Sequence, residues 1–130
     1  MDGLGEFRSA GRTLFSMGLV KGTEGNLSTF DGEKLLITRA GAMLNSIGDE
    51  SVVSGPLDGE LPGASSDLEV HRSAYRERGP GALVHAHPHG TVPEDGGGPG
   101  EHGIYVFGAS LPEAAEDAVR QARAFQRVDR

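Results

Sequence analysis

The chain has 130 residues, which fits a single domain over 1–130, but only 36% are hydrophobic and 21 are glycine, so the core is small and oligomerisation would help to cover it. A net charge of −7 without a run of lysine or arginine argues against nucleic acid as a partner. The absence of cysteine excludes disulfides and thiolate metal sites, so a transition-metal site here needs histidine and carboxylate.

The first part of the chain predicts a helix followed by strand pairs. Its beginning lacks the apolar core of a signal peptide, and no stretch approaches the roughly 20 apolar residues of a membrane span, so we expect a cytoplasmic protein without membrane contact. Residues 26–30 and 34–38 predict two strands joined by a turn at Asp31-Gly32, and 51–53 with the segment near Leu61 predict a weaker pair around Asp58-Gly59. Before them, residues 4–19 predict a helix with one recurring face of Leu4, Phe7, Gly11, Leu14, Phe15 and Gly18.

The second part predicts two helices and two strands. Ser65-Ser66-Asp67 is a candidate N-cap for a helix running to about Arg78, which Gly79-Pro80 would end. Residues 82–87 predict a buried strand, 90–101 a glycine- and proline-rich loop, and 103–107 a further strand. Residues 110–113 form a capping box for a last helix, whose apolar stripe consists of Ala115, Ala118, Val119, Ala122 and Phe125.

Histidine carries the strongest chemical signal. His85 and His87 alternate on a predicted strand, so both rings point to the same side of it. For such a pair alone, hydrogen bonding in a core and binding of a metal are about equally good interpretations. A third histidine, His102, at the start of the next strand favours a metal site, and three ligands leave a position open for catalysis. His89 follows Pro88 into the loop and is interpreted as a solvated residue.

Three segments could bind an anion. The turns at 25–28 and 37–41 contain glycine beside an amide or a hydroxyl, and Ser65-Ser66 stands at a predicted helix N-terminus, where free N–H groups and the helix dipole favour negative charge. Each segment alone is more often a simple turn or cap.

These segments together resemble one family. The order of GNLS (25–28), ITRAG (37–41), ASSDLEVH (64–71), ALVHAHP (82–88) and EHGIYVFGASLPEA (101–114) is similar to that of the class II aldolase/adducin family, over residues 7–90 and 101–125. The resemblance implies a single α/β domain with a central, mainly antiparallel sheet flanked by helices. It also implies Asp67 as the acid/base carboxylate, His85, His87 and His102 as ligands of Zn²⁺ or another divalent transition metal, and a phosphate site of Asn26, Thr38, Gly41, Ser65 and Ser66.

The chain departs from the family pattern in three ways. The first is Arg39 and Ala40, where relatives often have a small residue or serine before the glycine. Asp67 stands where the aldolases usually carry glutamate, which resembles the epimerase branch, and His71 follows it four residues later. Fourteen residues separate His87 from His102, where relatives spend several dozen, so residues 90–101 are interpreted as a loop replacing a longer segment that often carries a tyrosine. Tyr75 and Tyr105 are interpreted as core residues.

The resemblance implies a metal-dependent aldehyde-lyase. Such an enzyme cleaves or forms a carbon–carbon bond in a small phosphorylated ketose through a metal-stabilised enediolate. A sugar-phosphate 4-epimerase or a dehydratase of the same family stays open, as does a non-catalytic adducin-like metal-binding or scaffold domain. The relatives imply a homo-oligomer such as a tetramer.

Overall fold

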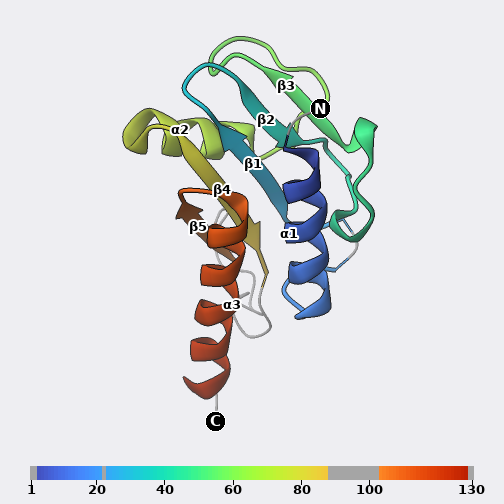
Figure 1. The fold of residues 1–130 in the computed structure, drawn as a ribbon, viewed down its shortest axis with the longest axis vertical. Helices are drawn as coiled ribbons and strands as arrows, with labels where there is room; N and C mark the ends of the chain where they lie inside the picture. Colours follow the sequence, from blue (N-terminus) through green and yellow to red (C-terminus); the bar gives the residue numbers. More distant parts are fainter. Residues whose placement is uncertain (1–2, 22, 88–102, 129–130) are drawn as a thin grey trace.

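The fold is an antiparallel sheet between helices (Figure 1). The computed structural model describes residues 3–21, 23–87 and 103–128. The five strands lie in the order β3-β2-β1-β4-β5, and every neighbouring pair is antiparallel. The elements are α1 (Leu4–Ser16), β1 (Asn26–Phe30), β2 (Leu35–Thr38), β3 (Val52–Gly55), α2 (Leu68–Arg78), β4 (Gly81–Ala86), β5 (Ile104–Gly108) and α3 (Leu111–Val128), with short 3-10 turns η1 (Leu44–Ser46) and η2 (Asp49–Ser51) before β3.

The sheet buries both of its faces because alternate side chains point to opposite sides. Leu27, Val84 and Val106 join the larger core with α1 and α3, which lie side by side against one face (Figure 1). On the other face, Leu35 and Leu83 pack with Tyr75 of α2. These observations confirm the expected α/β fold with a mainly antiparallel sheet flanked by helices.

The first predicted elements are confirmed, β1 with the predicted bounds and α1 and β2 with shorter ones. Helix α1 ends at Ser16, because Gly18 adopts a φ of +77° that a helix does not contain. Phe15 is 43% exposed, so its place on the buried face was wrong. The hairpin of β1 and β2 closes at Asp31, whose carboxylate accepts hydrogen bonds from the backbone N–H groups of Glu33 and Lys34.

The predicted strand pair around Asp58-Gly59 is wrong. Residues 52–55 form β3, but they pair with β2, and the segment near Leu61 forms no strand. Positive φ angles at Gly59 and Gly63 turn the chain on both sides of Leu61, so no extended run can develop there. An isolated bridge between Arg39 and Ala64 is the contact that returns this loop to the sheet.

The two later helices begin where the sequence predicted, but with different caps. Ser110 caps α3, since the N–H of Glu113 donates to its Oγ at 3.3 Å. Asp67 occupies the N-cap position of α2 without any side-chain capping bond, which corrects the expected cap and directs its carboxylate elsewhere. The predicted stripe of α3 is buried at Ala115, Ala118 and Ala122; the side chain of Phe125 and the loop 90–101 lie outside the described residues. None of the helices described is long and apolar enough to cross a bilayer.

Candidate functional site

Three neighbouring strands contribute one row of side chains beneath the start of α2. Asn26 of β1 pairs in register with His85 of β4, and His85 pairs with Tyr105 of β5. All three lie on the sheet face that α2 covers. Asp67, at the start of α2, completes the group. The site therefore joins residues 26, 67, 85 and 105, which are far apart in the sequence.

Asp67 is the centre of this group. Its Oδ2 accepts a hydrogen bond from Asn26 Nδ2 at 2.9 Å and contacts His85 Nδ1 at 2.8 Å. The hydroxyl of Tyr105 also hydrogen-bonds Asp67. Since a carboxylate only accepts, the Nδ1 of His85 carries a proton, and in the neutral tautomer Nε2 is then the nitrogen whose lone pair can bind a metal. Asn26 Nδ2 and His85 Nδ1 lie 3.4 Å apart as two donors aimed at the same oxygen.

The surroundings keep Asp67 charged. Burial pushes its pKa upward, but the hydrogen bond from Asn26, the nearby His85 and the hydrogen bond from Tyr105 outweigh burial and hold the pKa below its usual value. The pKa of Tyr105 shifts in the opposite direction. Burial and the charge of Asp67 raise it to about 12, so the hydroxyl stays a proton donor. The site therefore presents an ionised acceptor beside a neutral phenol.

The two predicted strand histidines come together. The ring centroids of His85 and His87 lie 4.7 Å apart, and the ring of Tyr105 stacks on His85 at 4.0 Å between centroids. His102 lies outside the described residues, as does His89. Gly103, the residue after His102, packs against His87: a Cβ built on it would stand 3.1 Å from His87 Nδ1. Within the ranges described, no cluster of three His, Cys, Asp or Glu side chains forms a metal site.

The residues predicted to hold phosphate fall into two groups. Thr38 and Ser65 are buried side by side, since the N–H of Ser65 donates to the Thr38 carbonyl at 3.0 Å. Their hydroxyl oxygens accept internal bonds, from Leu27 N and Asp67 N respectively. Gly41 (φ +81°) and Ser66, which follow them in the chain, are exposed.

Asn26 stands apart from that group. Its amide oxygen faces His71 Nε2 at 2.5 Å and its nitrogen faces Asp67. One N–H of its Nδ2 remains for a further acceptor, because an amide nitrogen carries two hydrogens.

Sequence reasoning missed Tyr105, which was interpreted as a core residue. Alternation along β5 puts Tyr105 on one face with Phe107, but only the register against β4 shows that this face carries His85. That register is a long-range property, and the local signal was merely a polar-tipped aromatic three residues after His102.

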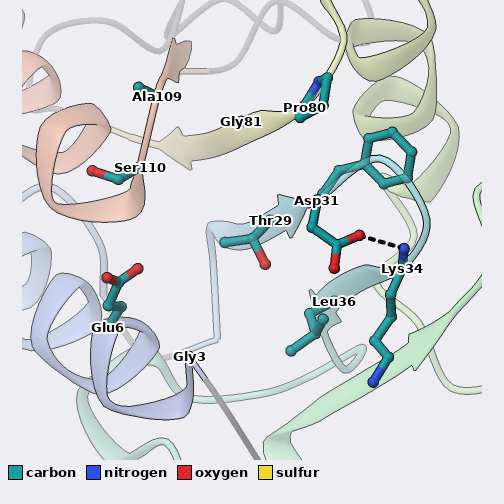
Figure 2. A pocket seen from close by; sticks show the side chains of 11 residues that line it. Gly3, Glu6, Thr29, Asp31, Lys34, Leu36, Pro80, Gly81, Ala109 and Ser110 are labelled. Carbon is teal, nitrogen blue, oxygen red and sulfur yellow. Dashed lines mark hydrogen bonds between the residues drawn. The ribbon is translucent and has the colours of Figure 1, made fainter.

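A cavity of about 500 Å³ lies at the opposite end of the same strands (Figure 2). It is lined by the turn between β1 and β2 at Asp31 and Lys34, and by the beginnings of α1 and α3 at Gly3 and Ser110. Phe30, at its wall, is four residues along β1 from Asn26, a separation of about 13 Å. The cavity is therefore separate from the histidine site.

Comparisons with known proteins identify the class that this fold and site define. Residues 6–93 match the model of the Class II Aldolase and Adducin N-terminal domain. The chain belongs to this family of class II aldolases and adducins.

The names of individual relatives are those of aldolases and of a bifunctional isomerase/dehydratase. The chain is 39% identical over 89 residues to 5-deoxy-D-ribulose 1-phosphate aldolase of Bacillus thuringiensis serovar kurstaki, covering 63% of this chain and 42% of the relative. It is 32% identical over 82 residues to a probable bifunctional methylthioribose-1-phosphate isomerase/methylthioribulose-1-phosphate dehydratase of Nocardia farcinica, covering 58% and 15%. The structure of L-fuculose-1-phosphate aldolase from Thermus thermophilus superposes with a TM-score of 0.62 and 41% identity, over 68% of this chain and 46% of that one. The chain thus spans less than half the length of these relatives.

Proposed function

We propose that this chain carries a metal-dependent lyase site of the class II aldolase type, which cleaves or forms a carbon–carbon bond in a small phosphorylated ketose. The observation that supports it most is the direction of Asp67. A residue at a helix N-cap would ordinarily use its carboxylate to cap, yet this one reaches His85 beside His87. A charged base next to paired imidazoles is the arrangement that such chemistry needs.

The described histidines fit a divalent ion. His85 donates its Nδ1–H to a carboxylate, the arrangement that orients a metal-binding imidazole and fixes its tautomer. His87 lies beside it, and Gly103 packs against His87. Zn²⁺ or another divalent transition metal held by His85, His87 and His102 would supply Lewis-acid stabilisation of charge on substrate oxygens.

The protein's own groups would move the proton. Asp67, ionised at neutral pH, would accept the proton of the substrate hydroxyl next to the breaking bond and return it to carbon. Tyr105 and Asn26 would hold the carboxylate in place meanwhile, since both donate to it. The neutral phenol of Tyr105 would also present a polar edge to substrate on the His85 side.

The start of α2 and the turn after β2 would hold the substrate phosphate. A backbone hydrogen bond joins Ser65 to Thr38 there, Gly41 and Ser66 follow these two residues in the chain, and Asn26 would add its second amide hydrogen. The helix dipole favours an anion at this end. A homo-oligomer such as a tetramer would complete the site if a second copy contributes residues at the subunit boundary.

A dehydratase is the second candidate, because the Nocardia farcinica relative carries that name at 32% identity. Both reactions begin with a proton moved beside a polarised carbonyl, so Asp67 and the histidines would serve either. Purified protein with measured metal content should be offered phosphorylated ketoses, with aldehyde release, water elimination and epimerisation followed separately. We expect activity that a chelator removes and zinc restores. If metal-loaded protein catalyses none of the three reactions, that result would favour the scaffold interpretation.

Asp67→Asn tests the proposed base. Asparagine keeps the size and the acceptor oxygen but cannot take a proton, and no capping bond is lost because Asp67 makes none. The variant should fold and bind metal, with a lower melting temperature because three donors lose their charged acceptor, while activity should fall by roughly a hundredfold or more. Glu77→Gln, an exposed carboxylate change on the same helix, is the matched control. Full activity in Asp67→Asn would remove the role.

A further inference from the structure

We propose that His71 is a positioning residue of the site, the middle member of a directed hydrogen-bond chain from Tyr75 through Ser28 and His71 that fixes which end of the Asn26 amide faces Asp67. The inference rests on the proposed role of Asp67 as base. His71 lies behind Asn26 and takes no part in the chemistry proposed above.

The chain is continuous and buried. Tyr75 OH lies 2.6 Å from Ser28 Oγ, and Ser28 Oγ lies 2.5 Å from His71 Nδ1. His71 Nε2 then lies 2.5 Å from Asn26 Oδ1, and Asn26 Nδ2 lies 2.9 Å from Asp67. His71 and Ser28 are fully buried, and Tyr75 is only 2% exposed. Water therefore cannot replace a missing member without rearrangement.

The match between a helix and a strand explains why these residues meet. Asp67, His71 and Tyr75 recur every four residues on one face of α2, a spacing of about 6 Å along a helix. Asn26 and Ser28 recur every two residues on β1, a spacing of about 6.8 Å. The two periods nearly coincide, so the helix residues and the strand residues interleave as alternate links. This match of spacings predicts a continuous row of hydrogen bonds between the helix and the strand, which burial of a single histidine would not by itself produce.

The direction of each bond follows from what each group can donate. A carboxylate only accepts, so the Asn26 amide must present its nitrogen to Asp67 and its oxygen to His71. His71 Nε2 therefore carries a proton. Burial lowers the pKa of His71 to about 3, with Asp67 opposing and His85 adding to the effect, so the ring is neutral and its Nδ1 accepts from Ser28. Ser28 in turn accepts from the Tyr75 hydroxyl.

The chain decides between two orientations that are nearly identical in shape. Rotating the Asn26 amide by 180° would aim its oxygen at the Asp67 carboxylate, two acceptors in contact. The Nε2–H of His71 prevents that rotation, because the rotated amide would meet it with a second donor. Loss of His71 would leave only Asp67 to disfavour the rotated amide, so Asn26 would be held from one side instead of two and would position the proposed base less firmly.

The tautomer of His71 can be read without any activity. In ¹⁵N NMR of the metal-free chain, His71 should be neutral with its proton on Nε2 from pH 5 to pH 8. Tyr75→Phe removes one hydroxyl and keeps the ring, so it should fold and should exchange-broaden the side-chain amide signals of Asn26. A proton on Nδ1 in the wild type, or unchanged Asn26 signals in both Tyr75→Phe and Ser28→Ala, would overturn the proposal.

Kinetics provide the second readout, once a lyase activity is measured. His71→Leu should lower kcat at least tenfold with KM within twofold and metal content unchanged. His71→Gln, which can still donate to Asn26, should recover most of that loss. Ser73→Ala, exposed on the same helix, is the control. Equal losses in the leucine and glutamine variants, or a loss in KM alone, would mean a purely structural role. If the wild type has no activity, the proposed function fails while the NMR result still decides the hydrogen-bond chain.

Discussion

At the scale of single residues, the site depends on donors that share one acceptor. The carboxylate of Asp67 accepts hydrogen bonds from Asn26, His85 and Tyr105. Each donor fixes the position of the carboxylate and thereby affects the other two. A bond to a charged group that is partly removed from water is worth more than one between neutral groups, about 1.5–3 kcal/mol. The orientation of His85 therefore depends on residues from three other elements.

The histidine assignment gives a prediction at this scale. Substitution of His85, His87 or His102 by alanine should abolish metal binding, because three imidazoles without a thiolate define an open site. Metal content after dialysis, measured by elemental analysis, should be about one equivalent per wild-type chain. His89→Ala should retain nearly all of it. If His89→Ala loses as much metal as His87→Ala, the assignment of the strand face is wrong.

Part of the site could be predicted from local patterns alone. Alternation on a strand placed His85 and His87 together, and their proximity is confirmed. The place of Tyr105 and the direction of the Asn26 amide could not be predicted, because both depend on the register between strands that are far apart in the sequence. Asp67 illustrates a third case, since the same residue could equally cap its helix and only the packed structure shows that it does not.

At the scale of elements, helices and the tight hairpin were predictable, whereas the loop after β3 was not. The Asp31-Gly32 turn is specified by its own residues, through bonds to the next two N–H groups. Asp58-Gly59 has the same two residue types, but Gly63 turns the chain again before a second strand can form. Turn signals thus predict a hairpin only where residues on both sides can extend.

The glycine before β1 gives a prediction for one element. Gly25 has a φ of +85°, and a Cβ there would stand 2.9 Å from the His85 carbonyl oxygen and 2.8 Å from Val20 Cγ1. Gly25→Ala should destabilise the fold by more than about 1 kcal/mol from backbone strain alone, with the steric clash added. Gly18→Ala, at φ +77° with open space around it, is the matched control for strain.

Chemical denaturation of the two alanine variants separates the two terms. The extra loss in Gly25→Ala over Gly18→Ala reports the close approach of β1 to β4 beside the site. Metal affinity should fall only in Gly25→Ala, because the displaced strand carries Asn26 away from Asp67 and His85. Equal destabilisation in both variants would show that the approach at Gly25 can relax without cost.

At the scale of the whole molecule, the sheet separates two environments. The face under α1 and α3 is almost wholly apolar, and it holds most of the buried hydrophobic residues. The face under α2 mixes a small apolar cluster with the buried polar ladder of Ser28, His71 and Tyr75. Stability therefore comes mainly from one face, which leaves the other to carry polar groups that need exact partners.

The buried His71 makes the stability of the whole fold depend on pH. Its pKa is about 3 in the folded chain, mainly because burial disfavours the charged ring, against about 6.5 when the chain is unfolded. Below pH 6.5 the unfolded chain therefore binds a proton that the folded chain does not. The free energy of unfolding should therefore fall as the pH decreases from 6.5 to about 3. Above pH 6.5 this group should add no pH dependence to the stability.

Comparison with His71→Gln isolates this contribution from the other titrating groups. Glutamine does not titrate, so the stability advantage of the wild type over this variant should shrink by about 2 kcal/mol between pH 7 and pH 5, at 1.36 kcal/mol per pH unit below 6.5. Urea unfolding of both proteins at the two pH values, with chelator present so that metal binding does not contribute, measures the change. An advantage that is constant across this interval would mean that His71 takes up a proton in the folded chain as readily as in the unfolded one.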